Sequence, residues 1–242
     1  MTHSDSSWTV ATYNIRLGIQ RGLCAVAQTL CSSHRPQIAA VQEIGDHWEM
    51  GPSGNSCLRL SQELQLSHWV FAPTITRKNE TPEPARYGHA LFSMWPIRSH
   101  QVIALPRHDD EPRVLLRSVI DTPSAPIEVL SAHLSHRRSD RPEQGKFLVQ
   151  WLRSNPSHQG ARFVLGDLNA TASEPFMSEL LDLFTDADAT AERPTFPESA
   201  PERRIDYILG QGVRLQSVDI TTQSGASDHR AIISRWLHKP LP

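Results

Sequence analysis

The stretch RFVLGDLN, residues Arg162–Asn169, joins a short apolar run to a turn that carries a carboxylate and an amide. The apolar run predicts a buried strand, and the spacing of apolar residues over 174–184 predicts a helix after it. Asp167 and Asn169 can face the same way at the exit of that strand. The carboxylate can accept a proton from water, and the amide can donate to a phosphoryl oxygen. Gly, Asp and Asn are also ordinary turn formers, so a plain turn is an equally good interpretation of this stretch alone.

Five other segments place polar residues beside strand-like apolar runs. They are TYNIR (Thr12–Arg16), VQEIG (Val41–Gly45), SAHL (Ser131–Leu134), RIDYI (Arg204–Ile208) and SDHRA (Ser227–Ala231). Polar residues that end apolar strands usually lie together at one end of a sheet. The side chains added in this way are Asn14, Glu43, His133, Asp206, Asp228 and His229. Oxygen ligands for a hard cation together with two imidazoles indicate metal-assisted attack of water on a phosphoester.

Several of these residues have plainer interpretations when taken alone. Asp228 and His229 can belong to a surface turn, or they can bind a metal or perform acid–base chemistry. Asp206 can be an edge-strand aspartate, or it can orient His229 as the aspartate of a catalytic triad does. His133 and His136 form an HxxH pair, but that spacing suits zinc poorly on an extended segment and no thiolate accompanies it. We therefore expect no zinc site.

The apolar pattern predicts about ten strands and four helices. Helices lie mostly between strands in the first part of the chain, and hairpins follow. This order favours a pair of sheets covered by helices over a purely parallel, doubly wound sheet. We expect helices at 23–34, 56–66, 143–154 and 174–184, and a strand over 37–43 that ends in Glu43. Because the candidate site draws on both halves of the chain, we expect residues 1–242 to form a single domain.

Composition limits the class of protein. The chain has 242 residues and a net charge of −2, so it lacks the basic excess of a dedicated non-specific DNA binder. Arg137, Arg138 and Arg141 can form a local basic patch or a solvated loop. The odd number of cysteines (Cys24, Cys31 and Cys57) without a CxxC pair predicts buried apolar thiols in a reducing compartment.

The first ten residues and the lengths of the apolar runs are the observations that bear on cellular location. The start MTHSDSSWTV lacks the basic and apolar regions of a signal peptide. No apolar run approaches the length of a membrane span. We therefore expect no membrane span and a cytoplasmic location.

The order of the segments is more specific than any one of them. TYNIR, VQEIG, YGHALFS (Tyr87–Ser93), SAHL, GDLN, RIDYI and SDHRA, in this sequence, resemble the endonuclease/exonuclease/phosphatase superfamily, which has the DNase I-like fold. The resemblance runs from Val10 to about Trp236, and GDLN and SDH are its most specific marks. It implies an α/β fold, a four-layer α/β sandwich with two packed mixed β-sheets flanked by helices. GDLNATASEP looks like the small bacterial-type metal-dependent hydrolases of this superfamily.

The resemblance also implies roles for individual residues. Glu43 matches the main ligand of Mg²⁺ (or Mn²⁺), with Asn14 and Asp228 completing the metal site. Asp167 matches the residue that orients or deprotonates the attacking water. Asn169 matches the amide that binds phosphate.

The two histidines have separate matches. His229, held by Asp206, matches the imidazole that touches the scissile phosphate. His133 matches the second histidine of the DNase-, sphingomyelinase- and inositol-phosphatase-like branches. In the DNase I branch a glutamate just before the strand equivalent to Tyr87–Ser93 pairs with that histidine. Here Ala85 and Arg86 occupy this place, and the nearby carboxylates are Glu80 and Glu83, so the partner of His133 stays open.

The function expected from the sequence is therefore a metal-dependent phosphoesterase that hydrolyses a phosphodiester or a phosphomonoester by in-line attack of water. A nuclease acting on DNA or RNA is one alternative. Another alternative is a binding protein that keeps the fold without catalysing a reaction. Such a protein would be expected to lose the glutamate, GDxN or SDH residues, and all of them are present here. The substrate classes implied are nucleic acid, nucleotide or lipid head group, and the oligomeric state is left open.

Overall fold

The computed structural model describes residues 7–78, 82–108, 110–157 and 159–238, and these contain two six-stranded sheets. The first sheet has the order β11-β12-β1-β2-β4-β3 and the second the order β5-β6-β7-β8-β10-β9. The strands of the first sheet are β1 (Ser7–Asn14), β2 (Ile38–Asp46), β3 (His68–Arg77), β4 (Ala85–Ser93), β11 (Val213–Ile220) and β12 (Ile232–His238). Those of the second are β5 (Ile97–Ala104), β6 (Val114–Asp121), β7 (Pro126–His133), β8 (Ala161–Asp167), β9 (Thr185–Asp186) and β10 (Asp206–Gln211).

Both sheets are mixed. β1 pairs with β2 in parallel, and β7 pairs with β8 in parallel, whereas the other pairs are antiparallel. The helices are α1 (Gly22–Leu30), α2 (Ser56–Leu64), α3 (Arg141–Ser154) and α4 (Pro175–Leu183), with a short 3₁₀ turn, η1 (Arg16–Gly18), after β1. Each parallel pair is joined through a helix, because parallel neighbours need a crossover connection.

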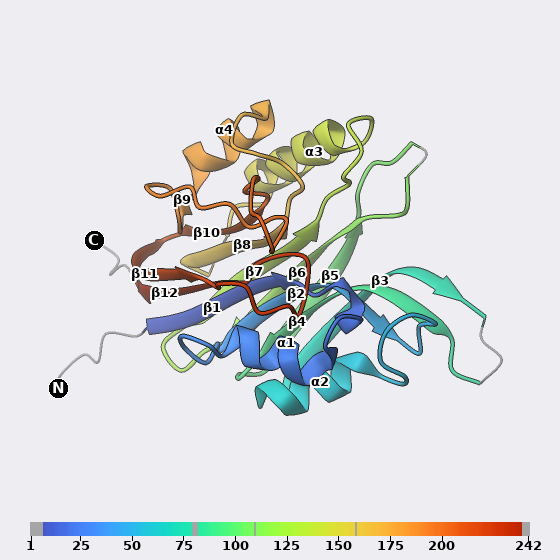
Figure 1. Ribbon diagram of the computed structural model, residues 1–242. Helices are drawn as coiled ribbons and strands as arrows, with labels where there is room; N and C mark the ends of the chain where they lie inside the picture. The colour runs from blue at the N-terminus through green and yellow to red at the C-terminus, as the bar shows by residue number, and fades with distance from the viewer. Residues whose placement is uncertain (1–6, 79–81, 109, 158, 239–242) are drawn as a thin grey trace.

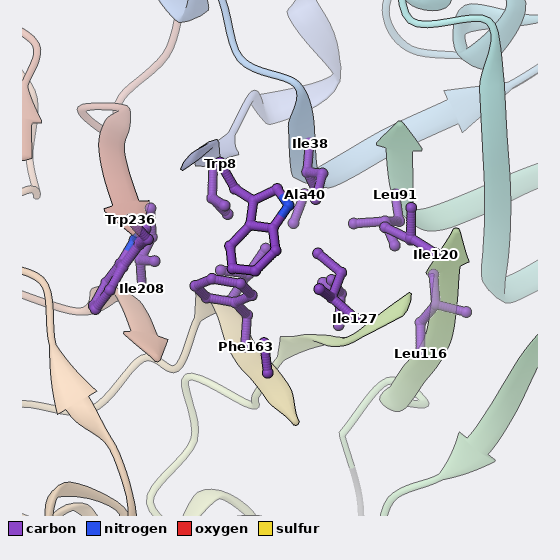
Figure 2. Packing of buried hydrophobic residues seen from close by; sticks show 14 of the residues in the cluster. Trp8, Ile38, Ala40, Leu91, Leu116, Ile120, Ile127, Phe163, Ile208 and Trp236 are labelled. Atoms are coloured by element: carbon purple, nitrogen blue, oxygen red, sulfur yellow. The ribbon is translucent and has the colours of Figure 1, made fainter. Parts of the chain in front are cut away.

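The main core lies between the two sheets, where their inner faces meet. Figure 2 shows Trp8 and Ile38 of the first sheet facing Phe163 and Ile127 of the second. Phe163 also lies edge-on to Trp236, with ring centroids 5.6 Å apart. The inward residues alternate along each strand, as the two-residue period of a strand requires.

The outer faces of the sheets are covered by helices. α1 and α2 pack on the first sheet through a cluster that includes Val26 and Leu60, and α3 and α4 pack on the second through a cluster that includes Leu148 and Phe176. In Figure 1 the two helix pairs lie on opposite sides of the paired sheets. This arrangement of helix, sheet, sheet and helix confirms the four-layer α/β sandwich with two packed mixed sheets that the sequence predicted.

The structure corrects several local expectations. The helix expected over 23–34 ends at Leu30, and the short strand β9 was not anticipated. The burial expected of Cys24 and Cys31 is wrong, because Cys31 is half-buried and Cys24 is exposed, whereas Cys57 is buried. Among the helices that the structure describes, none is long and apolar enough to cross a membrane.

Two of the three arginines of the candidate basic patch form ion pairs within the protein. Arg141 is buried and donates to Glu174 from Nη2 at 2.6 Å, while Arg137 pairs with Asp110 at 3.3 Å. These two guanidinium groups are therefore ion-paired within the protein, although Arg137 and Arg138 are exposed, so a local basic surface here stays an open alternative.

Candidate functional site

The end of β8 is the centre of the candidate site because two neighbouring strands bring polar residues to it. Asp167, the last residue of β8, lies opposite His133 in the parallel pairing with β7 and opposite Asp206 in the antiparallel pairing with β10. β7 ends and β10 begins at the same edge of the sheet. The preceding Gly166 has φ +142°, and a Cβ there would lie 1.9 Å from the carbonyl oxygen of Ala132. Glycine thus allows β7 and β8 to approach closely at this edge.

Glu43 reaches the site through a β-bulge. The register of β2 against β4 shifts between Val41 and Ile44, and Glu43 has φ 54°. Val41 and Ile44 both belong to the core beneath α1 and α2, although a regular strand would direct residues three apart to opposite faces. The extra residue supplied by the bulge turns Glu43 toward Asn14. The sequence predicted that Glu43 ends its strand. This prediction is wrong, because β2 continues to Asp46.

Asn14, the last residue of β1, links the two sheets at the site. Its Nδ2 donates to Glu43 Oε1 at 3.0 Å and to Asp167 Oδ2 at 3.1 Å. Its Oδ1 accepts from the backbone N–H of Arg16 at 3.1 Å. One amide group therefore joins two carboxylates that lie 124 positions apart in the chain (167 − 43).

His229 lies between two buried carboxylates. Its Nδ1 is 3.0 Å from Asp206 Oδ2, and its Nε2 is 3.7 Å from Asp167 Oδ2. Thr195 donates its hydroxyl to the same oxygen of Asp206 at 2.6 Å. Ser227, which starts the SDH segment, donates its hydroxyl to the carbonyl of Asn14 at 2.7 Å and so ties this segment to β1.

His133 has an unexpected partner. Its Nδ1 lies 2.7 Å from Nη1 of Arg113, and its Nε2 lies 3.5 Å from Asp167 Oδ2. Glu80, one of the carboxylates near this position in the sequence, lies outside the described residues. His133 Nδ1 thus contacts the guanidinium of Arg113. The resemblance to the DNase I branch implied a carboxylate at this place.

The last two predicted site residues lie at the margin of this cluster. Asn169 donates from its backbone N–H to Asp167 Oδ1 at 2.9 Å and from Nδ2 to the carbonyl of Leu134 at 2.9 Å. Asp228 is partly exposed, with 32% of its side chain accessible, and it lies 3.7 Å from Nη1 of Arg16. The structure thus gathers the predicted residues around Asp167, with Glu43, Asn169 and Asp228 partly exposed.

Burial and neighbouring charges give these groups unusual protonation behaviour. Burial raises the pKa of Glu43, and burial together with the charge of Asp206 raises the pKa of Asp167. Burial acts to lower the pKa of His229, but Asp206 and Asp167 outweigh it and raise that pKa to about 10. Burial and the charge of Arg113 hold the pKa of His133 well below its usual range. One imidazole is therefore a cation at neutral pH and the other is neutral.

Sequence reasoning missed three residues that contact the site. They are Arg113, Thr195 and Phe196, whose ring centroid lies 4.7 Å from that of His229. Arg113 could have been identified as a candidate because the EPR segment (Glu111–Arg113) places two charged residues directly before a strand. Thr195 and Phe196 lie in a proline-rich loop, and no periodicity of the sequence connects that loop to the site.

The ligand atoms of Asp167, Asp206 and His229 all lie within 4.8 Å of one another, a spacing that can hold a metal ion. A histidine must give up its proton to bind a metal. Because both carboxylates favour the protonated form of His229, the trio is better described as an ion-paired cluster. Glu43 is half-buried and hydrogen-bonds to Asn14, and among the described residues no cation lies within ion-pair distance of it, although His229 and Arg113 act on it from farther away.

Solved structures show the same fold at low sequence identity. An endonuclease/exonuclease/phosphatase from Beutenbergia cavernae is 20% identical with a TM-score of 0.79, and the match covers 96% of this chain and 72% of that one. The human nocturnin catalytic domain with a bound sulfate anion is 18% identical with a TM-score of 0.72 and coverages of 95% and 93%. Truncated Caenorhabditis elegans TDP2 is 20% identical with a TM-score of 0.66 and coverages of 96% and 97%.

No curated protein matches the chain at a significant level. The sequence model of the endonuclease/exonuclease/phosphatase family, however, matches residues 11–229, a span that begins within β1 and ends at His229. This span includes every residue of the site around Asp167. The chain belongs to the endonuclease/exonuclease/phosphatase family.

Proposed function

We propose that this chain is a metal-dependent phosphoesterase in which Asp167 positions water for in-line attack on phosphorus. The observation that carries the proposal is the convergence of three groups on one oxygen. Asp167 Oδ2 lies 3.1 Å from Asn14 Nδ2, 3.5 Å from His133 Nε2 and 3.7 Å from His229 Nε2. A buried carboxylate with a raised pKa is suited to take a proton, and the groups around it are suited to bind phosphoryl oxygens.

The proposal includes Mg²⁺ or Mn²⁺ beside Glu43. The residues fit a hard cation, because Glu43 is a half-buried carboxylate with no cation at ion-pair distance among the described residues, and its neighbours offer carboxylate and amide oxygens. Glu43 would hold the cation, with Asp228 and Asn14 completing the site. To bind the cation Asn14 would have to turn its amide, since Nδ2 now donates to both Glu43 and Asp167 and Oδ1 accepts from the N–H of Arg16; the two imidazoles would then remain on Asp167 Oδ2. When bound, the cation would offset negative charge on the phosphoryl or leaving oxygen.

The remaining residues have separate tasks in this scheme. His229, held in its charged form by Asp206, offers a positive charge to the phosphate and a proton to the leaving oxygen. Asn169 uses one N–H on the carbonyl of Leu134, which leaves its second N–H for a phosphoryl oxygen. His133 presents Nε2 to the same carboxylate oxygen of Asp167 at 3.5 Å.

A panel of phosphoesters tests the proposal. It would contain bis(p-nitrophenyl) phosphate, p-nitrophenyl phosphate, plasmid DNA, RNA, and vesicles containing sphingomyelin or phosphatidylinositol, each with Mg²⁺ or Mn²⁺. We expect hydrolysis of at least one class, its loss with EDTA, its return with added metal, and its absence in Asp167→Asn. Activity that survives thorough chelation would contradict the metal requirement. Metal binding by a folded protein that hydrolyses nothing in the panel would favour a non-catalytic binding protein.

The proposal treats residues 1–242 as one functional domain, because the site residues come from both sheets. The substrate classes are those expected from the sequence: nucleic acid, nucleotide or lipid head group. The cytoplasmic location stays a prediction from the cysteine content.

A further inference from the structure

The partner of His133 is a buried guanidinium, and this contact has a specific chemical consequence. Arg113 is 5% exposed and directs Nη1 at His133 Nδ1 over 2.7 Å. A guanidinium has five N–H donors and no acceptor, so the imidazole nitrogen that faces it must supply a lone pair. The proton of a neutral His133 is therefore confined to Nε2, the nitrogen 3.5 Å from Asp167 Oδ2.

We propose that Arg113 is a positioning residue that fixes His133 as the Nε2–H tautomer and so makes it a neutral hydrogen-bond donor to the site. The lowered pKa of His133 agrees with this arrangement, since burial and the positive charge of Arg113 both disfavour an imidazolium there.

The Nδ1 partner of His229 has the opposite charge to that of His133. Both imidazoles present Nε2 to the same oxygen of Asp167, at 3.5 Å from His133 and 3.7 Å from His229. Their Nδ1 atoms, however, face a guanidinium in one case and the carboxylate of Asp206 in the other. The carboxylate holds a proton on Nδ1 of His229, whereas the guanidinium excludes one from Nδ1 of His133. The charge of the Nδ1 partner therefore differentiates two side chains that are otherwise placed alike.

Arg113 is itself fixed from several directions. Its Nη2 lies 2.5 Å from Glu111 Oε1, and its carbonyl accepts from the N–H of Leu105 at 2.9 Å. Asp110, in the same segment, is buried and accepts from the hydroxyl of Ser135, two residues after His133. The segment before β6 is thus attached to the loop after β7. This attachment keeps the guanidinium against the imidazole.

The catalytic consequence rests on the proposed phosphoesterase function. His133 would donate its Nε2–H to Asp167 or to a phosphoryl oxygen, and it would not release a proton as an imidazolium does. Delivery of a proton to the leaving oxygen would then belong to His229. The sequence left this task open between the two histidines, and the contact with Arg113 assigns it to one of them.

The tautomer can be measured without substrate. We would label the histidines with ¹⁵N and record long-range ¹H–¹⁵N spectra of the full chain in EDTA between pH 6 and 8. The His133 signals are identified by their loss in His133→Gln. We expect a protonated Nε2 and a bare Nδ1 throughout this range. A proton on Nδ1, or an imidazolium at neutral pH, would overturn the proposal.

Variants then test whether Arg113 is the cause. Arg113→Met should allow the Nδ1–H tautomer or the imidazolium to appear, and Arg113→Lys should restore the wild-type pattern because an ammonium is also only a donor. Arg117→Met is the matched control, since Arg117 lies on β6 and pairs with Glu128, and it should leave the His133 signals unchanged. If Arg113→Met fails to fold, Glu111→Gln should still increase the minor tautomer. An unaltered Nε2–H tautomer in folded Arg113→Met would refute the role of Arg113.

Kinetics separate this inference from the proposed function. On a substrate identified by the panel, Arg113→Met should lower kcat by about tenfold to a hundredfold with little change in KM, as expected for a residue that acts through another. Arg113→Lys should recover most of the loss. If the wild-type chain hydrolyses nothing, the phosphoesterase proposal fails, while the spectra still decide the tautomer of His133. A fall in activity with an unchanged tautomer would count against Arg113 as a positioning residue.

Discussion

Asp167 and Asp206 lie opposite each other in the antiparallel pairing of β8 and β10, and both carboxylates reach the imidazole of His229. Burial and the charge of Asp206 raise the pKa of Asp167, and a cationic imidazole between the two carboxylates offsets their negative charge. The register of one strand pair therefore places a base candidate and a charged imidazole side by side.

The division of roles between Asp167 and Glu43 can be tested with metal. Asp167→Asn keeps the shape of the side chain but removes the base, so kcat should fall by about two to four orders of magnitude. Glu43→Gln should weaken metal binding as well, so excess Mn²⁺ should recover part of its loss and none of the loss in Asp167→Asn. Activity would be measured against metal concentration for both variants. Rescue of Asp167→Asn alone would mean that the two roles are reversed. Near full activity in both variants would show that these residues do not form the catalytic site.

Asp206 should set the charge of His229. In Asp206→Asn the imidazole loses the larger of its two carboxylate influences, so the pKa of His229 should fall from about 10. The alkaline limb of the pH–rate profile should move to lower pH, and kcat near neutrality should drop by up to about 10⁴, as when the aspartate of a catalytic triad is replaced by asparagine. An NMR titration of His229 would accompany the kinetics. An unchanged titration in the variant would show that Asp206 does not hold this charge.

The His229 cluster should also make stability depend on pH. The folded pKa of His229 is about 10, above its unfolded value of about 6.5, so the folded state binds more protons between these values. The stabilisation is fully present below about pH 6.5 and is lost as pH rises through about 10, with a slope of up to about 1.4 kcal/mol per pH unit. Urea unfolding in EDTA at pH 6 to 10 would measure this.

The same unfolding series provides its own controls. His229→Gln should remove most of this slope, because glutamine has no proton to lose in the range. His100, which is exposed on β5, is the matched control, and His100→Gln should keep the wild-type slope. Equal slopes in wild type and His229→Gln would contradict the charge assigned to His229.

Gly166 should be intolerant of a side chain. Its φ of +142° is unfavourable for other residues, and an added Cβ would meet the carbonyl oxygen of Ala132 at 1.9 Å. Gly166→Ala should therefore cost about 2–5 kcal/mol in the free energy of unfolding. Gly54 also has positive φ, +78°, but a Cβ there would have nothing within 4 Å. Gly54→Ala should cost about 1 kcal/mol, so a similar loss in both variants, measured by chemical denaturation, would argue against a contact effect at Gly166.

Much of the fold could be predicted from the sequence because strands and helices leave a local pattern. The alternation that buries Trp8 and Val10, and the helical spacing of Val26 and Leu30, depend only on near neighbours in the chain. The end of β8 at Asp167 was predictable for the same reason, since an apolar run gives way to Gly-Asp there. Helix ends were less predictable, because α1 ends at Leu30 although its predicted helix ran to His34.

What the sequence by itself determined is thus the order of the elements and the residue types available at their ends. Only the tertiary structure decided which of those residues meet. The bulge that turns Glu43 toward Asn14 depends on the register of β2 against β4, and the contact between Arg113 and His133 depends on a segment held across the end of β7. Neither contact has a local signature, because each arises from the packing of strands that are distant in sequence and from the burial that follows. Burial is also what raises the pKa of Glu43 and, with neighbouring charges, separates the two imidazoles into a cation and a neutral donor.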